Sequence, residues 1–293
     1  MSKIEGKTKI ITPYKDGKVL IKTKDTLSAG DGVKRAVITD IGKHKTTQTS
    51  KVFSLLNNNN IDTAFINKHS PNEMLCYDCD MLPIEWVIRR YAWGSYLTTH
   101  PWLKEKTQPH KLIGPPTLEM FHKLTLVNIG EPKLISENSA REKYLIDGKW
   151  DDNVYTDPLI ALFNDKWTLY SRLGHSLKSK PLMDIEPLLS PDDLRLVIDN
   201  LVIPTFEVLE KAWSNIETSE GPVALADMKL EIGKRKSDGK YVVADVIDND
   251  SWRIWPGGNP KKQLDKQCFR DDYNLNDVSK NYEIVTKLVE SFS

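Results

Sequence analysis

The sequence has few cysteines, no long hydrophobic run and no excess charge of either sign. Its 293 residues include three cysteines, and an odd number in a chain of this length does not form a disulfide framework. No stretch approaches the ~20 apolar residues of a membrane span. The opening residues, MSKIEGKTK, are charged where a secretory signal requires an apolar core. We therefore expect a cytoplasmic protein with no membrane partner.

The charge balance excludes a general affinity for polyanions. Lysine plus arginine equals aspartate plus glutamate at 41 each, so the formal net charge is zero. The eight tryptophans are not interleaved with basic residues, and we expect no nucleic-acid partner. The chain is 39% hydrophobic, which is enough for a core, and its length suggests one large domain or two modest ones.

Hydrophobic periodicity predicts strands early in the chain and helices late in it. Ser190 and Pro191 form a helix start signal, and Pro204 should kink or split that helix. The stretch 107–157 has poor periodicity and is expected to be irregular. The expected strands are 18–24 and 83–91, and the expected helical runs are 51–56 (ending in Asn57–Asn60), 190–202, a second run through Trp213, and 277–292.

The sharpest signal is an alternating run over residues 223–232 (VALADMKLEI). One parity is apolar throughout. The other begins apolar and becomes charged at Asp227, Lys229 and Glu231. The pattern predicts a strand with one buried face and one face that becomes charged towards its end.

A second run, 241–247, follows a turn and carries Asp245. If the two runs pair as a hairpin, Glu231 and Asp245 lie opposite or diagonal on the same face. Two such carboxylates, with substrate phosphates in the remaining positions, suit octahedral Mg²⁺. The alternative is a solvated polar face with cross-strand ion pairs. Apolar neighbours make isolated carboxylates costly, so both interpretations stay open.

Four further motifs are weak individually. Each has an ordinary alternative, a surface turn or a surface ion pair. The EGKTK motif lacks the first glycine of a Walker loop, although its glycine and lysines suit a polyphosphate. The four motifs are Glu5–Lys9, Ser28–Gly32 (SAGDG), Arg89-Arg90 with Gly94-Ser95, and Asp250–Arg253 with Lys266 and Arg270.

Taken together, the motifs resemble those of SAICAR synthetase, or phosphoribosylaminoimidazole-succinocarboxamide synthase. They occur in the order and approximate spacing of that family, and the later ones are most similar to the synthetase half of the bifunctional animal enzyme. That enzyme continues into a carboxylase domain, which we do not expect within these 293 residues. The matching segments are EGKTK, SAGDG, MLPIEWVIRRYAWGS (81–95), DMKLEIG (227–233) and ADVIDNDSWRIW (244–255).

The resemblance implies a two-lobed α+β fold related to ATP-grasp and kinase-like folds, with a nucleotide cleft between the lobes. Residues 1–88 would form a β-rich nucleotide-binding lobe, and residues 89–293 a larger α+β lobe with the metal and substrate sites. It also implies a ligase of de novo purine biosynthesis that uses ATP and Mg²⁺. The enzyme would join 5-amino-4-carboxyimidazole ribonucleotide to L-aspartate through an acyl phosphate, giving SAICAR, ADP and phosphate. A homodimer is one assembly open to it.

The resemblance also implies roles for individual residues. The ATP-binding candidates are Lys7, Lys9, Met81 (near the adenine) and Lys123, and the metal ligands are Glu231, Asp245 and Asp157. Asp227 and Lys229 would line the reaction centre. The substrate-binding candidates are Arg89, Ser95, Arg253, Lys266 and Arg270, together with Ser28 and Asp31 of the SAGDG turn.

Two alternatives remain. One is a different ATP-dependent carboxylate–amine ligase on the same scaffold. The other is a nucleotide-binding relative without turnover, which the presence of every charged residue that the mechanism needs disfavours.

Overall fold

The computed structural model describes residues 3–29, 34–104, 108–163, 166–173, 179–271 and 274–292. The chain divides into two compact units: unit 1 comprises residues 1–81 and 196–293, and unit 2 comprises residues 82–195. This division differs from the expected boundary at residue 88, because C-terminal elements pack on N-terminal ones. Helix α7 (Leu275–Glu290), for example, packs against α1 (Ile41–Asn58). The chain passes between the units within strand β8 (Cys79–Arg89) and helix α4 (Pro191–Val197).

Unit 1 combines an antiparallel sheet with the longest helices of the described residues. Its other elements are β1 (Ile4–Glu5), β2 (Lys9–Tyr14), β3 (Lys18–Thr23), β4 (Thr26–Ala29), β5 (Lys34–Val37), β6 (Phe65–Ser70), β7 (Glu73–Tyr77), a π-helical turn (Ile198–Val202), α5 (Ile203–Ser214), β20 (Glu217–Thr218), β21 (Gly221–Arg235), β22 (Tyr241–Ala244), β23 (Trp252–Pro256), a 3₁₀ turn (Pro260–Lys262) and α6 (Gln267–Arg270).

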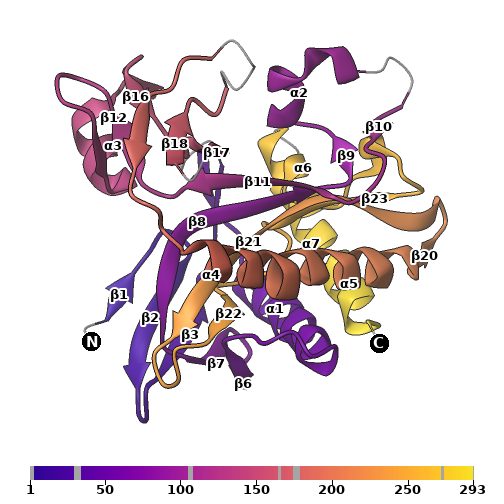
Figure 1. The fold of residues 1–293 in the computed structure, drawn as a ribbon. Helices are drawn as coiled ribbons and strands as arrows, with labels where there is room; N and C mark the ends of the chain where they lie inside the picture. Colours follow the sequence, from indigo (N-terminus) through magenta and orange to yellow (C-terminus); the bar gives the residue numbers. More distant parts are fainter. Residues whose placement is uncertain are drawn as a thin grey trace. The chain divides into compact units, whose positions relative to one another are not determined.

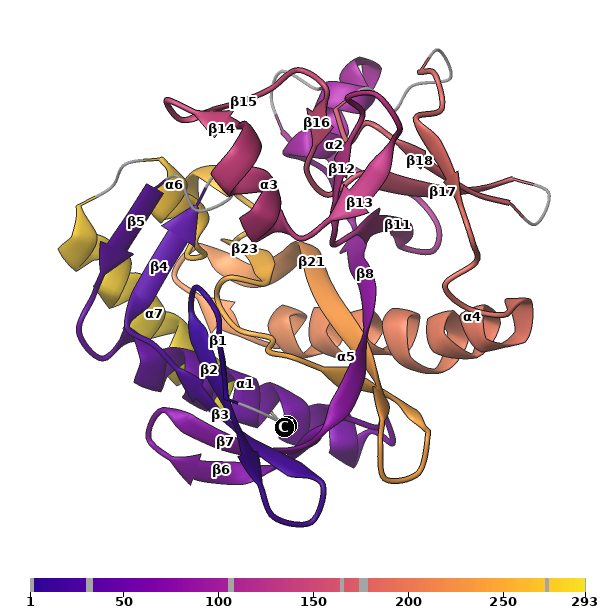
Figure 2. The same ribbon diagram turned by 90° about the vertical axis from the view of Figure 1, so that its left-hand side faces the viewer.

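The N-terminal sheet has the strand order β1-β2-β3-β7-β6. β3 confirms the strand predicted at 18–24, and it follows a tight turn in which Asp16 and Gly17 have positive φ. Helix α1 packs against β3, β6 and β7, as Figure 2 shows. The predicted run 51–56 is the C-terminal part of α1, which ends at Asn58 within the asparagine run.

A second layer forms around β21, a strand of 15 residues. It pairs in antiparallel fashion with β20, β22 and β23, and α5 runs along it (Figure 1). The predicted hairpin is therefore confirmed as β21 and β22. The strict alternation predicted for 223–232 is interrupted, because the register with β23 shifts between Leu225 and Asp227. Such a bulge re-aims the side chains that follow it.

The C-terminal helical region begins as predicted and continues past its proline. Ser190 Oγ accepts a hydrogen bond from the Asp193 amide at 3.1 Å, which caps α4. Pro204 does not split the helix. A π-helical turn precedes it, and Val202 and Ile203 keep helical dihedral angles. We attribute this continuity to the π turn, which re-routes the carbonyls that proline would leave without a donor.

Unit 2 carries short antiparallel strands and small helices. Strands β8, β11, β17, β18 and β19 pair in that order. The elements that follow β8 are β9 (Tyr91–Ala92), α2 (Ser95–Thr99), a 3₁₀ turn (Pro101–Leu103), β10 (His110–Lys111), β11 (Thr117–His122), β12 (Thr125–Val127), β13 (Lys133–Ile135), α3 (Glu137–Tyr144), β14 (Leu145–Ile146), β15 (Lys149–Trp150), β16 (Val154–Tyr155), β17 (Leu159–Phe163), β18 (Lys166–Tyr170) and β19 (Met183–Ile185).

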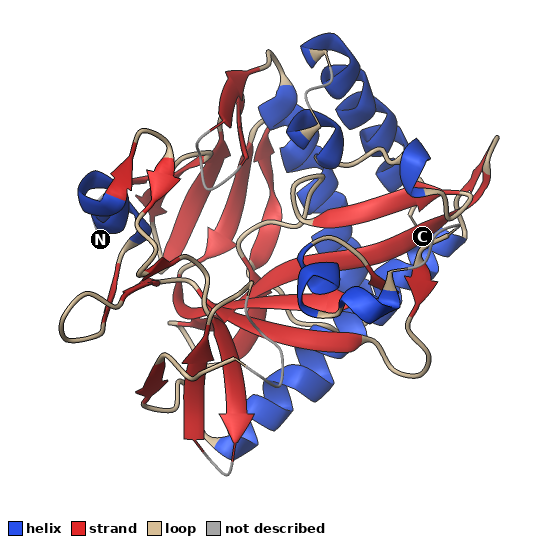
Figure 3. Cartoon of the chain, turned by 90° about the horizontal axis from the view of Figure 1, so that it is seen from above, coloured by secondary structure: helices blue, strands red, loops and turns tan. Residues whose placement is uncertain are grey.

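The irregular structure expected over 107–157 is wrong in part. The segment holds strands β10 to β16 and helix α3, which Ser136 caps by accepting from the Ser139 amide at 3.2 Å. Most of these strands have two or three residues, too few for a periodic pattern to register. Within the described residues, no helix is long and apolar enough to cross a membrane. Figure 3 shows the mixture of helices and strands that defines an α+β protein.

Candidate functional site

The carboxylates of Glu231 and Asp245 both interact with Lys9. In the β21–β22 pairing, Glu231 lies opposite Ala244, so Asp245 is the residue directly after its partner. Regular alternation would turn the Asp245 side chain to the other face. β22 ends at Ala244, however, and Asp245 has a φ of 60°, a left-handed conformation that breaks the alternation. Asp245 Oδ1 then accepts a hydrogen bond from Lys9 Nζ.

The charges of both carboxylates act on the ammonium of Lys9. Burial alone would lower the pKa of Lys9, but the charges of Asp245 and Glu231 outweigh burial and raise it. Lys229 adds a second ammonium, with Nζ 4.0 Å from Glu231 Oε1. Glu231 is 6% exposed, so these cations compensate a carboxylate that is largely removed from water. The cluster combines two acidic and two basic side chains.

Asp227 and Arg253 form the next part of the site. They lie directly opposite each other on β21 and β23, immediately after the bulge. Arg253 Nη1 donates to Asp227 Oδ2 at 2.6 Å, and Asp227 is 4% exposed. Arg253 Nε is buried and has no hydrogen-bond partner among the described residues. The guanidinium therefore has one buried donor without an acceptor among the described residues.

Gly233 allows Met81 to lie close to the same strand. A Cβ at Gly233 would lie 2.8 Å from Cys79 Cβ and 3.0 Å from Met81 Sδ, distances too short for an alanine without movement. Glycine thus sets how closely the beginning of β8 approaches β21. Met81 itself is 41% exposed, so part of the residue is accessible to solvent.

Lys266 and Arg270 lie at α6, beside the loop that joins β22 to β23. Lys266 Nζ lies 3.3 Å from Asp250 Oδ2. Burial lowers the pKa of Lys266, and the charge of Asp250 opposes that effect. For Arg270, burial and the neighbouring Arg253 both lower the pKa. Lys266 and Arg270 thus lie at the two ends of α6, and each is under the influence of charged side chains of the same unit.

The candidates of unit 2 have partners within that unit. Arg89 Nε pairs with Glu119 Oε2 at 2.5 Å, across β8 and β11. Arg172 Nη1 donates to Asp157 Oδ2 at 2.8 Å, and Asp157 has a φ of 43°. Ser95 begins α2 directly after Gly94.

The remaining candidates are less defined by geometry. The Lys123 amide donates to the Pro83 carbonyl at 2.9 Å. Ser28 lies on β4, whereas Asp31 lies outside the described residues. Lys7 follows Gly6, whose amide donates to the Lys9 carbonyl at 2.8 Å and closes a turn. Among the described residues, no three His, Cys, Asp or Glu side chains form a metal-binding group. The metal-ligand roles of Glu231, Asp245 and Asp157 stay predictions, and Asp157 belongs to the other unit.

Several buried polar residues of unit 1 escaped the sequence interpretation. Lys45 lies outside the helical run predicted at 51–56, and Tyr282 is an apolar position of the predicted helix 277–292; both side chains contact Asp250. Asp265 accepts hydrogen bonds from the amides of Ile254 and Gln267, and burial raises its pKa to about 6. The signal that could have found Lys45 is its place between residues of the apolar face of α1, where an unpaired ammonium would be costly.

Comparisons with known proteins agree along nearly the whole chain. The family model described as SAICAR synthetase matches residues 2–146 and 191–288, so Asp157 lies between the matched segments. The phosphoribosylaminoimidazole-succinocarboxamide synthase of Herpetosiphon aurantiacus is 33% identical over 295 residues, covering 98% of this chain and 96% of the relative. The bifunctional phosphoribosylaminoimidazole carboxylase/phosphoribosylaminoimidazole succinocarboxamide synthetase of Homo sapiens is 31% identical, covering 98% of this chain and 57% of the relative.

Solved structures give the same result. A SAICAR synthetase (Type-2) in complex with ADP has a TM-score of 0.70 at 25% identity, covering 98% of this chain and 97% of the other. A SAICAR synthetase from Pyrococcus horikoshii OT3 shares the fold, with a TM-score of 0.64 at 23% identity and coverage of 96% and 97%. The sequence and the fold agree, and this chain belongs to the SAICAR synthetase family.

Proposed function

We propose that this chain joins 5-amino-4-carboxyimidazole ribonucleotide to L-aspartate, using ATP and releasing ADP and phosphate. The observation that carries the proposal is the similarity over nearly the whole chain to enzymes named for this reaction. The cluster of Lys9, Glu231 and Asp245 supports it, because it combines the charges that a triphosphate and its cation require.

The chemistry explains why ATP is needed. A resting carboxylate is a poor acylating agent, since no good leaving group departs when an amine attacks it. Transfer of the γ-phosphoryl group to the carboxylate gives an acyl phosphate, and the amine of aspartate then displaces phosphate. The protein must position the reactants and neutralise charge.

Lys9 and Lys7 are proposed to contact the phosphates of ATP. The Lys9 ammonium is held by Asp245 at the site, and the raised pKa of Lys9 keeps it cationic. Met81, at the strand that approaches Gly233, is proposed to contact the adenine. Lys123 is a further phosphate-binding candidate.

Mg²⁺ fits Glu231 and Asp245. Both are carboxylates within the field of one lysine, and Mg²⁺ is bound by one or two carboxylates together with substrate phosphates and water. When bound, the ion would neutralise charge on the transferring phosphoryl group. Asp157 pairs with Arg172 in unit 2. Its proposed role as a third ligand rests on the family resemblance alone.

Arg253 is proposed to bind the carboxylate or phosphate of the imidazole nucleotide. Asp227 fixes one edge of its guanidinium, and the buried Nε remains as a donor. Arg89 and Ser95 are proposed to take part in binding the same substrate, together with Ser28, Asp31, Lys266 and Arg270. Asp227 and Lys229 are proposed to line the reaction centre. We propose a cytoplasmic enzyme, with a homodimer as one assembly open to it.

The direct test is phosphate release from ATP and Mg²⁺ with the imidazole nucleotide and a panel of amino acids. The proposal requires turnover that depends on L-aspartate and a product with the mass of SAICAR. Turnover with another amine alone would identify a different carboxylate–amine ligase. Tight binding of ATP and the imidazole nucleotide without phosphate release would identify a relative that has lost catalysis.

A further inference from the structure

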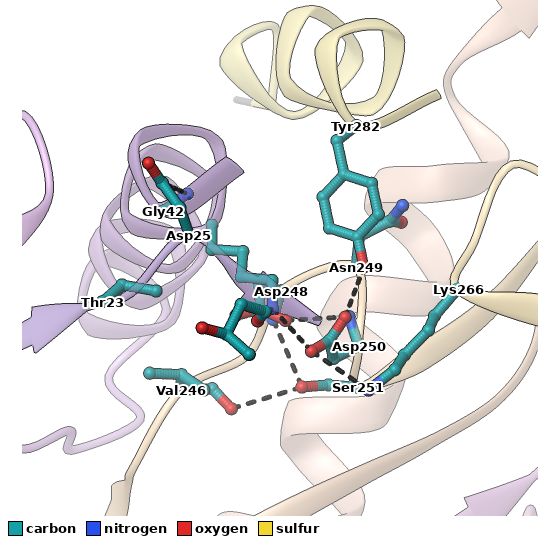
Figure 4. Close-up of polar contacts among 12 residues, drawn as sticks. Thr23, Asp25, Gly42, Val246, Asp248, Asn249, Asp250, Ser251, Lys266 and Tyr282 are labelled. Atoms are coloured by element: carbon teal, nitrogen blue, oxygen red, sulfur yellow. Dashed lines mark hydrogen bonds and ion pairs between the residues drawn. The ribbon is translucent and has the colours of Figure 1, made fainter. Parts of the chain in front are cut away.

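The half-buried carboxylate of Asp250, apart from the Glu231–Asp245 pair, contacts three donors. Asp250 Oδ2 accepts from Lys45 Nζ at 2.8 Å and lies 3.3 Å from Lys266 Nζ. Asp250 Oδ1 accepts from the hydroxyl of Tyr282. Figure 4 shows Asp250 between Tyr282 and Lys266, with Asp248 alongside. One carboxylate thus joins side chains from α1, α7 and the segment before α6.

Lys45 alone explains why a carboxylate is present. Its side chain is 2% exposed, and a buried ammonium without a counter-charge would be strongly destabilising. The contact of Asp250 with Lys266 is not needed to compensate Lys45. The Lys266 side chain is 12% exposed, and it places a second ammonium on an oxygen that Lys45 already uses. The second contact therefore requires a reason other than compensation of Lys45.

The backbone near Lys266 is fixed by the same loop. The Lys266 amide donates to the Asn249 carbonyl at 3.3 Å, and the Asn249 side chain donates to the Leu264 carbonyl at 3.0 Å. The Asn249 amide in turn donates to Gln48 Oε1 of α1 at 2.8 Å. Position and direction of the Lys266 side chain are consequently set from both ends.

The loop also reaches the proposed reaction centre. The Lys229 amide donates to the Ser251 carbonyl at 2.7 Å, and Arg253 follows two residues later on β23. Asp250 itself accepts from no residue assigned to ATP among its described hydrogen bonds and ion pairs. A substitution at Asp250 should therefore weaken binding of the imidazole nucleotide more than binding of ATP.

We propose that Asp250 is a positioning residue that holds the Lys266 ammonium in place to bind the anionic groups of the imidazole nucleotide. The inference rests on the proposed function, in which Lys266 binds that substrate. Lys45 fixes Asp250 from the interior, and Tyr282 fixes its second oxygen. The Tyr282 hydroxyl stays protonated, since burial and the neighbouring Asp250 charge raise its pKa.

The test compares Asp250→Asn, Lys266→Met and the double variant by calorimetric binding of the imidazole nucleotide and of ATP. Because Asp250→Asn leaves Lys45 uncompensated, Lys45→Met with Asp250→Asn is the paired variant that keeps the buried group neutral. We expect Asp250→Asn and the paired variant to weaken imidazole-nucleotide binding about 10- to 100-fold, the loss typical of a misplaced binding group. ATP binding should change less than about 3-fold, and adding Lys266→Met should cause little further loss, since both changes remove one interaction.

Val289→Ala is the matched stability control. Val289 is fully buried on α7, two turns beyond Tyr282, and its truncation lowers the melting temperature without touching the Asp250 group. It should leave both affinities unchanged. If Asp250→Asn instead weakens the binding of ATP and of the imidazole nucleotide equally and also lowers the melting temperature, the role of Asp250 is structural and the inference is wrong.

Two other outcomes are equally decisive. Tighter binding by Asp250→Asn would mean that Asp250 withholds Lys266 from the substrate, which contradicts positioning. If wild-type protein binds the nucleotide and turns over while Lys266→Met is unaffected, the inference fails and the proposed function stands. Absence of imidazole-nucleotide binding by the wild type would overturn both.

Discussion

Asp245 shows how one backbone angle can decide a site. On a regular strand its carboxylate would face away from Glu231, and its positive φ returns it to Lys9. Aspartate tolerates the left-handed region better than most residues. The sequence indicated the hairpin and the residue types, but the conformation at Asp245 depends on where β22 ends, which periodicity does not specify.

Asp245→Asn should lower kcat by about 100-fold or more while leaving the fold intact, because it removes one charge from the proposed Mg²⁺ site. Steady-state phosphate release at saturating Mg²⁺ measures the effect, and circular dichroism checks the fold. Asp238→Asn is the control: Asp238 lies in the turn of the same hairpin and pairs with Arg235 at 2.6 Å on the surface. Wild-type turnover by Asp245→Asn would contradict the assignment.

Arg253→Lys should weaken binding of the imidazole nucleotide about 10-fold or more and ATP binding much less, because lysine keeps the charge but loses the planar guanidinium. The structure adds a reason for the asymmetry. Arg253 uses Nη1 for Asp227, and the single ammonium of a lysine cannot reproduce the separate donors of the guanidinium in the same geometry. Dissociation constants for the two ligands, measured separately, test this. Equal losses would show that Arg253 stabilises the site without contacting the imidazole nucleotide.

Helices α1 and α7 contact each other through polar as well as apolar side chains. His44 Nδ1 lies 3.0 Å from Thr286 Oγ1, and Gln48 Nε2 donates to the same oxygen at 3.0 Å. Burial lowers the pKa of His44, although the charges of Glu283 and Asp40 oppose it. The folded state therefore binds the proton less well than the unfolded state does.

This difference predicts a pH dependence. The pKa of His44 in the folded state is below its unfolded-state value of about 6.5. The free energy of unfolding therefore falls as the pH drops from the unfolded-state pKa to the folded-state pKa. His44→Gln should reduce the fall in the free energy of unfolding between pH 7 and pH 5, measured in urea. His69→Gln, at an exposed position of β6, is the control for the loss of a histidine side chain as such. An unchanged slope in His44→Gln would exclude this histidine as the cause.

Elements with long, regular patterns were the ones that sequence could predict. β3, the β21–β22 hairpin, the capped start of α4 and α7 follow from periodicity and capping residues. The short strands of 107–157 did not, because two or three residues carry no period. The π turn before Pro204 also escaped prediction, since it depends on how a packed helix accommodates a proline rather than on the proline itself.

For the chain as a whole, motif order identified the family better than any single motif identified a role. The comparisons confirm the resemblance, whereas the roles of individual residues remain predictions. The buried Lys45–Asp250–Tyr282 contacts could not be predicted, because they join residues distant in the sequence, Lys45 being 205 residues from Asp250. Such contacts follow from the packing of α1 against α7, which no local pattern encodes.

Nucleotide binding should stabilise the whole molecule and should require the metal. A ligand at 100 times its dissociation constant adds about 2.7 kcal/mol to the free energy of unfolding, which for a chain of this size means a rise of several degrees in the melting temperature. Thermal unfolding with ATP and Mg²⁺ should show this rise, and chelation of Mg²⁺ with EDTA should remove most of it. In Asp245→Asn the rise with ATP should no longer depend on Mg²⁺, because the variant lacks one of the two proposed carboxylate ligands. If ATP stabilises the wild type equally with and without Mg²⁺, Glu231 and Asp245 serve to hold Lys9 in place, and the metal must be bound elsewhere or not at all.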